Sequence, residues 1–425
     1  MRDAKNILVY FEDETSFIGT LRAEFIHGKE LFSFEYDSKW LKNPKCLFLD
    51  PDLYLYRGRQ YLPDSKNQFG VFMDSSPDRW GRLLMRRREA LYAEKEKRSV
   101  KELTESDFLL GVHDIARIGA IRYKTETSGA FLSDKSENAA PPWATLRDLE
   151  YAAYNFEGEN QNTQKFGEWL SILLAPGSSL GGARPKATVQ DTDGNLWIAK
   201  FPSKNDEINT GAWEMVVHDL ADQCGLNVPD AKMETFSKYG STFLVRRFDR
   251  KPDSAIYSGK RIHFSSAMTL LGKQDGASGA DGTSYLDIAE FIRSNGAEPQ
   301  KDLVELWKRI VFSIAVTNTD DHLRNHGFIL QNDGWHLSPM YDVNPNPFAG
   351  SIGNATLSLN ITENDNRANS SLALKVAPFF GLSKMEAVKI VAEIFAIVQN
   401  WHSIAAHYGL SPSAIKQMKP CFADY

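Results

Sequence analysis

The stretch Asn318-Thr319-Asp320-Asp321-His322-Leu323-Arg324-Asn325 directly follows an apolar segment, Leu303 to Val316, whose spacing predicts a helix. Asp320 and Asn325 stand five residues apart. This is the interval between the catalytic aspartate and the metal-binding asparagine in the catalytic loop of phosphoryl-transfer enzymes. There, one carboxylate orients the attacking hydroxyl group and one amide oxygen reaches a magnesium ion on the phosphates. The spacing therefore predicts a phosphoryl-transfer loop.

A further carboxylate that could bind the metal ion follows this segment. Asp342 comes seventeen residues after Asn325, beyond an expected hairpin of Phe328 to Leu330 and Trp335 to Leu337. It would bridge the metal. The alternative is that these polar residues only cap a helix end and shape a surface turn. Because three metal-type ligands follow an apolar helix and flank a hairpin, the functional interpretation is the better one.

A glycine-rich segment, Gly177-Ser178-Ser179-Leu180-Gly181-Gly182-Ala183-Arg184-Pro185-Lys186, enters an expected hairpin. Its strands are expected at Lys186 to Gln190 and Leu196 to Phe201, with a turn at Asp191 to Asn195. Glycines let backbone N–H groups approach phosphate oxygens closely. The segment matches neither the Walker A pattern nor the GxGxxG pattern. Taken alone, it is more often explained by a flexible turn.

Lys200 lies in the apolar stretch Trp197 to Phe201, where an ammonium group needs a partner. Kinases place such a lysine on the strand after the glycine loop, paired with phosphates and a helix glutamate. The spacing of apolar residues from Trp213 to Cys224 predicts the next helix, with Gly225 as its C-terminal cap. Glu214, on this expected helix, would be that partner. The alternative is an edge-strand lysine that points to water.

The order of these parts decides between the alternatives. A glycine loop, a strand lysine, a helix glutamate, an Asp-x-x-x-x-Asn loop and a metal aspartate follow one another as in protein-kinase-like phosphotransferases. The fold class expected is α+β, protein-kinase-like and two-lobed, with an α/β N-terminal domain packed on a mainly helical C-terminal lobe. The expected divisions are residues 1–140, 141–255 and 256–425.

Composition sets outer limits on this interpretation. The 425 residues carry a formal net charge of −6, so no global basic field would draw the chain onto DNA or anionic lipid. The three cysteines form no metal-ligand spacing, which fits a reducing cytosol. The longest apolar stretches are too short to span a bilayer, so we expect a cytoplasmic protein without membrane contact.

Several motifs together resemble the HipA serine/threonine kinases, the toxins of bacterial toxin–antitoxin pairs. The resemblance covers nearly the whole chain. It is carried by the following segments: Gly19 to Leu21, Phe32 to Tyr36, Ser76 to Arg82, Gly119 to Tyr123, Ser179 to Lys186, Gly225 to Pro229, Arg247 to Arg250, Thr319 to Asn325, and Pro339 to Asp342.

The resemblance implies Asp320 as the catalytic base, with Asn325 and Asp342 as ligands of Mg²⁺. It implies that Lys200 holds the phosphates of ATP. Ser179 aligns with the serine that HipA kinases phosphorylate on themselves, and Ser178 is the adjacent alternative.

Further residues are expected at the nucleotide. The list is Gly181, Gly182 and Glu214, the backbone around Arg246 to Phe248 at the adenine, and His322. Family members often carry an acidic residue where Arg246 stands, which is a departure at the adenine position. His322 could instead position the catalytic loop or satisfy a local hydrogen bond, and such a structural role is favoured.

The resemblance also implies partners. These are a HipB-like helix-turn-helix antitoxin, operator DNA reached mainly through that antitoxin, and a protein substrate, for which aminoacyl-tRNA synthetases are the family's example. Two other interpretations stay open at this point. One is a small-molecule kinase of the same fold, and the other is a catalytically silent binding or repressor protein.

Overall fold

The structure is a computed structural model that describes residues 4–43, 46, 48–63, 65–134, 140–157, 164–177, 182–253, 256–349 and 355–422. The chain forms two compact units. The first contains Met1–Asn205 and Asp249–Ser265, and the second contains Asp206–Phe248 and Ser266–Tyr425. The chain therefore passes between the units three times, and each unit is described by itself.

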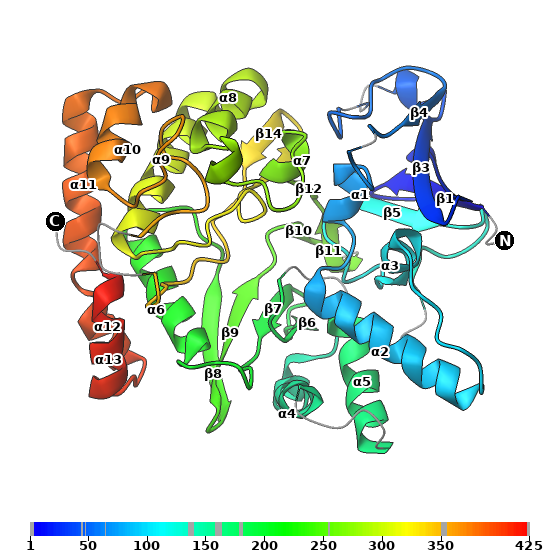
Figure 1. Cartoon of the computed structure of the whole chain (residues 1–425), viewed down its shortest axis with the longest axis horizontal. Coiled ribbons are helices and arrows are strands. Elements are labelled where there is room, and N and C mark those ends of the chain that lie inside the picture. The colour runs from blue at the N-terminus through cyan, green and yellow to red at the C-terminus, as the bar shows by residue number, and fades with distance from the viewer. Residues whose placement is uncertain are drawn as a thin grey trace. The chain divides into compact units, whose positions relative to one another are not determined.

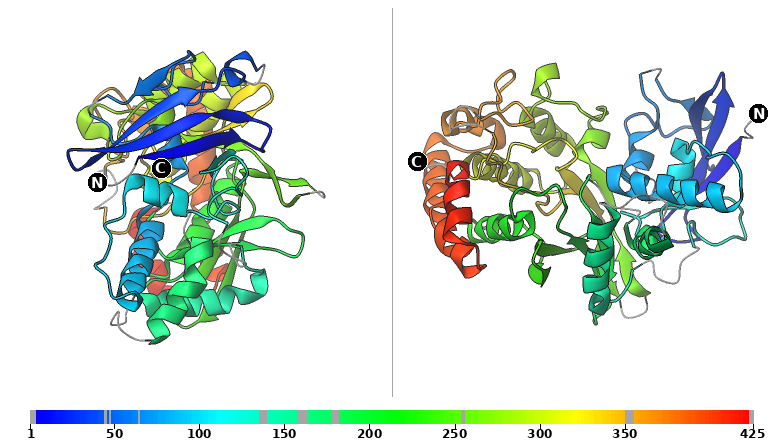
Figure 2. Two further views of the ribbon diagram at one scale, coloured as in Figure 1. Left: turned by 90° about the vertical axis from the view of Figure 1, so that its right-hand side faces the viewer. Right: turned by 60° about the horizontal axis from the view of Figure 1, so that its bottom comes forward.

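The first unit begins with an antiparallel sheet of strand order β4-β3-β2-β1-β5, drawn in blue and cyan in Figure 1 and seen from another side in Figure 2. Its strands are β1 (Lys5–Phe11), β2 (Phe17–Ile26), β3 (Lys29–Tyr36), β4 (Arg59–Tyr61) and β5 (Ile121–Lys124). Bulky apolar side chains of β1, β2 and β3 are buried, which supplies this part of the unit with a core.

Helices and two hairpins complete the first unit. The helices are α1 (Gly70–Asp74), α2 (Arg79–Lys95), α3 (Glu105–Gly111), α4 (Leu146–Phe156) and α5 (Gln164–Gly177). Helix α5 packs against both α2 and α4. The hairpins are β6 (Lys186–Gln190) with β7 (Leu196–Lys200), and β10 (Arg250–Asp253) with β11 (Ile256–Arg261). The strand β12 (His263–Ser266) lies where the chain leaves the unit.

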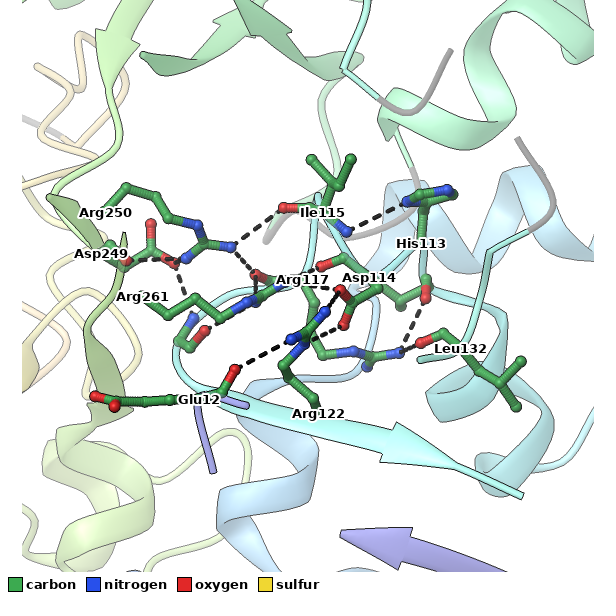
Figure 3. A network of polar contacts seen from close by, with 12 residues as sticks. Glu12, His113, Asp114, Ile115, Arg117, Arg122, Leu132, Asp249, Arg250 and Arg261 are labelled. Atoms are coloured by element: carbon green, nitrogen blue, oxygen red, sulfur yellow. Dashed lines mark hydrogen bonds and ion pairs between the residues drawn. The ribbon is translucent and has the colours of Figure 1, made fainter. Parts of the chain in front are cut away.

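A buried polar network joins the β10–β11 segment to the rest of the first unit (Figure 3). Arg250 donates to the carbonyl oxygens of Ile115 and Arg117 at 3.2 and 2.8 Å. Arg261 donates to the carbonyl oxygen of Gly119 at 3.1 Å and to that of Asp114 at 2.5 Å. Residues more than a hundred positions apart in the chain are thereby fixed to one another.

The second unit combines one hairpin near its start with a mainly helical remainder. Its elements are α6 (Thr210–Gln223), β8 (Ala231–Ser237), β9 (Gly240–Arg246), α7 (Ala267–Leu270), α8 (Tyr285–Asn295), α9 (Pro299–Ala315), β13 (Gly327–Gln331), β14 (Gly334–Leu337), α10 (Ser370–Val376), α11 (Lys384–Val398), α12 (Trp401–His407) and α13 (Pro412–Met418). Helix α9 is buried along most of its length and packs against α8, α10 and α11. It is therefore the central helix of this unit.

Short 3₁₀ helices occur in both units. They are η1 (Trp40–Lys42), η2 (Trp143–Thr145), η3 (Gly279–Asp281), η4 (Ala377–Phe380) and η5 (Lys419–Cys421).

The local predictions agree with these elements. The two hairpins expected at residues 186–201 and 328–337 are confirmed as β6–β7 and β13–β14. The helix expected from the spacing of Trp213 to Cys224 is confirmed as α6, and Gly225 follows it with a φ of +67°, as a left-handed helix end requires. Within the described residues, no helix is long and apolar enough to cross a membrane.

Candidate active site

The segment after α9 forms a tight loop closed by its own hydrogen bonds. The carbonyl oxygen of Asp320 accepts from the backbone N–H of His322 at 3.0 Å and from Nδ2 of Asn325 at 2.8 Å. The carbonyl oxygen of His322 accepts from the backbone N–H of Asn325 at 2.8 Å. Because Nδ2 of Asn325 is held inside the loop, its amide is fixed in one orientation, with Oδ1 at the other end.

The neighbouring carboxylates Asp320 and Asp321 differ in environment. The Asp320 residue is exposed, whereas Asp321 is buried. Asp321 accepts from the hydroxyl groups of Tyr285 at 2.6 Å and Ser313 at 3.3 Å, and Nε2 of His326 lies 3.1 Å from its Oδ1. The interpretation of the sequence gave Asp321 no role of its own. In the sequence, nothing distinguishes Asp321 from the neighbouring Asp320, so the different environments of the two carboxylates could not be predicted.

Electrostatics support a charged Asp321. Burial alone would raise the pKa of its carboxyl group, but the interaction with the neighbouring His326 and the donated hydrogen bonds outweigh burial and lower the pKa. Asp321 thus fixes the loop to α8 and α9, while the adjacent Asp320 lies on the surface.

A second loop, containing Asp342, is bonded to the first. The backbone N–H of Asn344 donates to Oδ1 of Asn318 at 3.3 Å. The backbone N–H of Asn346 donates to the carbonyl oxygen of Thr317 at 3.1 Å, and its Nδ2 donates to Oγ1 of Thr319 at 2.8 Å. The structure therefore brings the loop of Asp320 and the loop of Asp342 side by side in the second unit.

The backbone at Asp342 has an uncommon conformation. Its φ is +58°, in the left-handed region that non-glycine residues rarely adopt. The preceding Tyr341 is held by its hydroxyl group, which donates to the carbonyl oxygen of Arg324 at 2.7 Å. Such strain is found at functional sites when the surrounding contacts enforce it.

The donor set here suits magnesium. Asp342 contributes a carboxylate and Asn325 an amide oxygen, and Mg²⁺ in proteins is commonly held by one or two carboxylates together with water and substrate phosphates. Among the described residues, no cluster of three or more His, Cys, Asp or Glu side chains could hold a metal by itself.

In the first unit, two lysines stand opposite each other on the β6–β7 hairpin. Lys186 pairs with Lys200 in the antiparallel register, and both are buried. Directly opposite residues of such a pair point to the same face of the sheet. The two ammonium groups therefore concentrate positive charge on one face, as a phosphate site needs. The interpretation of the sequence had singled out Lys200 alone; strand register supplied the second lysine.

The glycine-rich segment is described in part. Ser178, Ser179 and Gly181 lie outside the described residues. Gly182 has a φ of +83°, and a Cβ atom there would lie 2.7 Å from Nζ of Lys186. The left-handed backbone therefore favours glycine at this position.

Comparison with known proteins places the chain in a family. The family model of HipA-like C-terminal domains matches residues 178–401, more than half of the chain. The chain belongs to this HipA-like family. The matched region includes residues 178–186 of the glycine-rich segment, the β6–β7 hairpin and both loops of the second unit.

Curated relatives cover smaller regions. Over 185 residues the chain is 29% identical to a Sinorhizobium fredii protein named "Putative kinase Y4mE", covering 39% of this chain and 41% of the relative. Over 214 residues it is 27% identical to a Haemophilus influenzae protein named "Putative kinase", covering 46% of this chain and 61% of the relative. The chain thus spans about half the length of the curated relatives it matches.

A solved structure extends the likeness across the chain. A chain of the Shewanella oneidensis MR-1 toxin–antitoxin complex of HipA, HipB and operator DNA matches with a TM-score of 0.64 at 16% identity. The match covers 97% of this chain and 94% of the other. The fold of this HipA-like chain is therefore α+β and protein-kinase-like, as predicted.

The remaining predicted residues of this HipA-like chain lie in the second unit. Glu214 is buried on α6, and its expected pairing with Lys200 stays a prediction because Lys200 belongs to the first unit. Arg246, at the position where the family often carries an acid, is bonded to Asp230. Its backbone N–H donates to the Asp230 carbonyl oxygen at 2.8 Å, and its guanidinium lies 3.0 Å from the Asp230 carboxylate. The adenine contact of Arg246 also stays a prediction.

The Phe248 ring lies 5.7 Å from that of Tyr341 between centroids, which connects the segment after β9 to the Asp342 loop. His322 shapes the loop of Asp320 through its backbone hydrogen bonds. Its ring nitrogen Nδ1 is buried and finds no hydrogen-bond partner within the described part of the chain. The nucleotide contacts expected of Phe248 and His322 remain predictions.

Proposed function

We propose that this chain is a Mg-ATP-dependent serine/threonine protein kinase that acts as the toxin of a toxin–antitoxin pair. The observation that carries the proposal is the joining of the Asp320 loop to the Asp342 loop, with the amide of Asn325 held inside the Asp320 loop. This supplies a carboxylate on the surface for a hydroxyl group and two oxygen ligands for magnesium. Membership of the HipA-like family agrees with this chemistry.

Each residue then has a defined task. Asp320 orients a serine or threonine hydroxyl group and accepts its proton as the oxygen bonds to the γ-phosphorus of ATP and ADP leaves. Oδ1 of Asn325 and the carboxylate of Asp342 would hold magnesium. When bound, that ion neutralises phosphate charge. Lys200, and by its register Lys186, would bind phosphate oxygens.

Mass spectrometry tests this activity. Purified protein, first treated with a phosphatase, is incubated with magnesium and ATP, and phosphate is mapped by intact and peptide mass. We expect one added phosphate on Ser179 or Ser178, and none in Asp320→Ala. A loss of activity after that phosphate is added would support self-inactivation through the glycine-rich segment. A panel of small hydroxyl acceptors run in parallel separates a protein kinase from a small-molecule kinase.

If no phosphate is transferred, a measurement of ATP binding shows which explanation holds. A dephosphorylated wild-type chain that binds ATP without transferring phosphate to itself or to any acceptor would contradict the proposed kinase activity. A dephosphorylated chain that binds no ATP would leave a binding protein without catalysis as the better explanation. Asp342→Ala provides the matched test of the metal site, because it should lose magnesium-dependent turnover while the fold is retained.

We extend the proposal to partners of a defined kind. The matched Shewanella oneidensis complex contains HipA, HipB and operator DNA. We propose that this chain likewise binds a HipB-like helix-turn-helix antitoxin and reaches operator DNA mainly through it. Its substrate would be a protein, with aminoacyl-tRNA synthetases as first candidates. Co-expression with the helix-turn-helix protein encoded beside it should yield a stable complex on size-exclusion chromatography, and separate elution would contradict the pairing.

A further inference from the structure

The motif Ser76 to Arg82 contacts the described end of the glycine-rich segment within the first unit. Oδ2 of Asp78 accepts from the backbone N–H of Gly182 at 2.5 Å. The backbone N–H of Trp80 donates to the carbonyl oxygen of Gly182 at 3.2 Å. The Trp80 indole Nε1 donates to the carbonyl oxygen of Lys186 at 3.0 Å. Three hydrogen bonds thus join the start of α2 to both ends of residues 182–186.

The Asp78 carboxylate has two separate functions. Its other oxygen, Oδ1, accepts from the backbone N–H of Arg79 at 2.7 Å and caps the first turn of α2. Capping an exposed helix start needs one oxygen only. The second oxygen therefore serves the contact with Gly182, a residue 104 positions away in the chain.

The Trp80 side chain is rigidly supported. It is 1% exposed, and its ring meets Phe156 of α4 edge-to-face at 5.7 Å between centroids. Phe156 in turn stacks on Phe166 of α5 at 4.9 Å. The indole N–H is therefore presented to Lys186 from a packed aromatic cluster, and it costs little conformational entropy to hold it there.

These contacts bear on a segment that needs accurate placement. The left-handed backbone of Gly182 brings its Cα beside the ammonium group of Lys186. Lys186 faces the same side of the hairpin as Lys200. A displacement of residues 182–186 by about 1 Å would move the ammonium group and the adjoining amides together, and misplacement of that size is costly in phosphoryl transfer.

We infer that Asp78 and Trp80 are positioning residues for nucleotide binding: they clamp residues 182–186 so that the backbone amides and Lys186 are held ready for ATP phosphates. This inference rests on the proposed kinase function. It gives the N-terminal part of the chain an indirect task in nucleotide binding, in addition to any partner contact.

Two variants remove the clamp while keeping the surrounding structure. Asp78→Asn retains one acceptor oxygen for the α2 cap, but it cannot accept from both Arg79 and Gly182. Trp80→Phe retains the aromatic packing on Phe156 and loses the indole N–H. Thr104→Ala is the matched control, because Thr104 caps α3 in the same unit and its side chain contacts Asp107 and Ser106.

Steady-state kinetics and amide hydrogen exchange supply the readouts. We expect Asp78→Asn to raise the KM for ATP about tenfold, as befits the loss of one charge-assisted hydrogen bond, with a much smaller change in kcat. The amides of residues 182–186 should exchange faster in both clamp variants. Thr104→Ala should lower thermal stability without changing the KM for ATP or the exchange of residues 182–186.

The outcomes separate this inference from the proposed function. An active wild type whose KM for ATP and exchange at 182–186 are unchanged by Asp78→Asn and Trp80→Phe would overturn the clamp. An increase of KM no larger than that in Thr104→Ala would also overturn it, because the effect would then reflect general stability. If the wild type neither binds ATP nor transfers phosphate, the proposed function fails, while unchanged exchange at 182–186 would independently count against the clamp.

Discussion

At the scale of single residues, adjacent aspartates take opposite tasks. Asp321 is enclosed by Tyr285, Ser313 and His326, and its pKa is lowered despite burial. Asp320 is exposed and shapes the loop through its carbonyl oxygen. A loop this tight turns successive side chains to different sides, so one carboxylate anchors and the other is presented to solvent.

This division predicts opposite results for two conservative changes. Asp321→Asn should lower the free energy of unfolding by about 2–3 kcal/mol, because a buried charge beside His326 is removed. Asp320→Asn should change it by less than about 0.5 kcal/mol, as for an ordinary surface position. Kinase activity should nonetheless be lost in Asp320→Asn. Urea unfolding measures the stability of the two variants, and a phosphorylation assay measures their activity. Equal stability losses in the two variants would contradict the different roles given to Asp320 and Asp321.

His263 predicts a dependence of stability on pH. Burial lowers its pKa to about 3 from the ordinary value of 6.5. Between these values the unfolded chain binds a proton that the folded unit does not, so stability falls as pH falls, by up to about 1.4 kcal/mol per pH unit.

His263→Phe tests this dependence. It keeps an aromatic ring beside Phe11, whose centroid lies 5.5 Å from that of His263, and removes the titration. The free energy of unfolding in urea is measured from neutral to mildly acidic pH. As the pH falls, it should decrease less steeply for His263→Phe than for the wild type. Parallel slopes would show that other groups cause the pH dependence.

At the scale of secondary-structure elements, the turn of the β6–β7 hairpin is organised by Asp191. Its Oδ1 accepts from the backbone N–H groups of Asp193 and Asn195 at 3.0 and 2.8 Å. Its Oδ2 accepts from Nδ2 of Asn195 and from Nε1 of Trp197 at 2.9 and 2.8 Å. The carboxylate thus fixes the turn that aligns the two lysine-bearing strands.

Asp191→Ala should therefore weaken this hairpin. We expect a stability loss of about 1–2 kcal/mol, because several donors lose a charged acceptor, and faster amide exchange across residues 186–200. Asp193→Ala, in the same turn but with an exposed side chain, is the matched control and should change neither quantity appreciably. Equal exchange in the two variants would mean that the backbone turn holds the hairpin without Asp191.

The sequence predicts these elements well and their long-range bonds poorly. The hairpin signal at residues 191–195 and the periodicity of Leu303 to Val316 act over neighbouring residues, where local preferences dominate. The bond from Asp78 to Gly182 and the bonds of Asn346 to the loop of Asp320 depend on how distant segments pack. No pattern of residue types encodes such contacts.

At the scale of the whole molecule, the first unit takes in a segment from the middle of the chain, Asp249–Ser265. Composition suggests contiguous regions, and the predicted divisions at 140 and 255 are of that kind. A compact unit is defined by spatial contacts, which can join distant stretches of chain. Here the hydrogen bonds of Arg250 and Arg261 attach their segment to residues 114–119 (Figure 3). The predicted divisions describe contiguous stretches of sequence, whereas the two units are defined by contacts in space. The predicted divisions therefore stay predictions.

Asp114 is the acidic centre of this connection. Its carboxylate binds Arg122 at 2.5 Å and Arg261 at 3.1 Å. Burial alone would raise its pKa, but the guanidinium groups of Arg261 and Arg122 outweigh burial and lower the pKa to about 2. Since the unfolded value is 3.8, its stabilising effect is present above about pH 4 and is lost as pH falls toward 2.

Asp114→Asn should then loosen the inserted segment from its unit. Two guanidinium groups would lose a buried counter-charge, which we expect to cost about 3 kcal/mol in the unfolding of the first unit. Amide exchange should accelerate both at residues 115–119 and at residues 250–261, because the same bonds protect both. Asp365→Asn, whose partner Arg367 is 63% exposed, is the matched control in the second unit and should cost less than about 1 kcal/mol. If exchange accelerates at residues 115–119 alone, the β10–β11 segment is held by its own hairpin bonds, and the network does not join the unit's two stretches of chain.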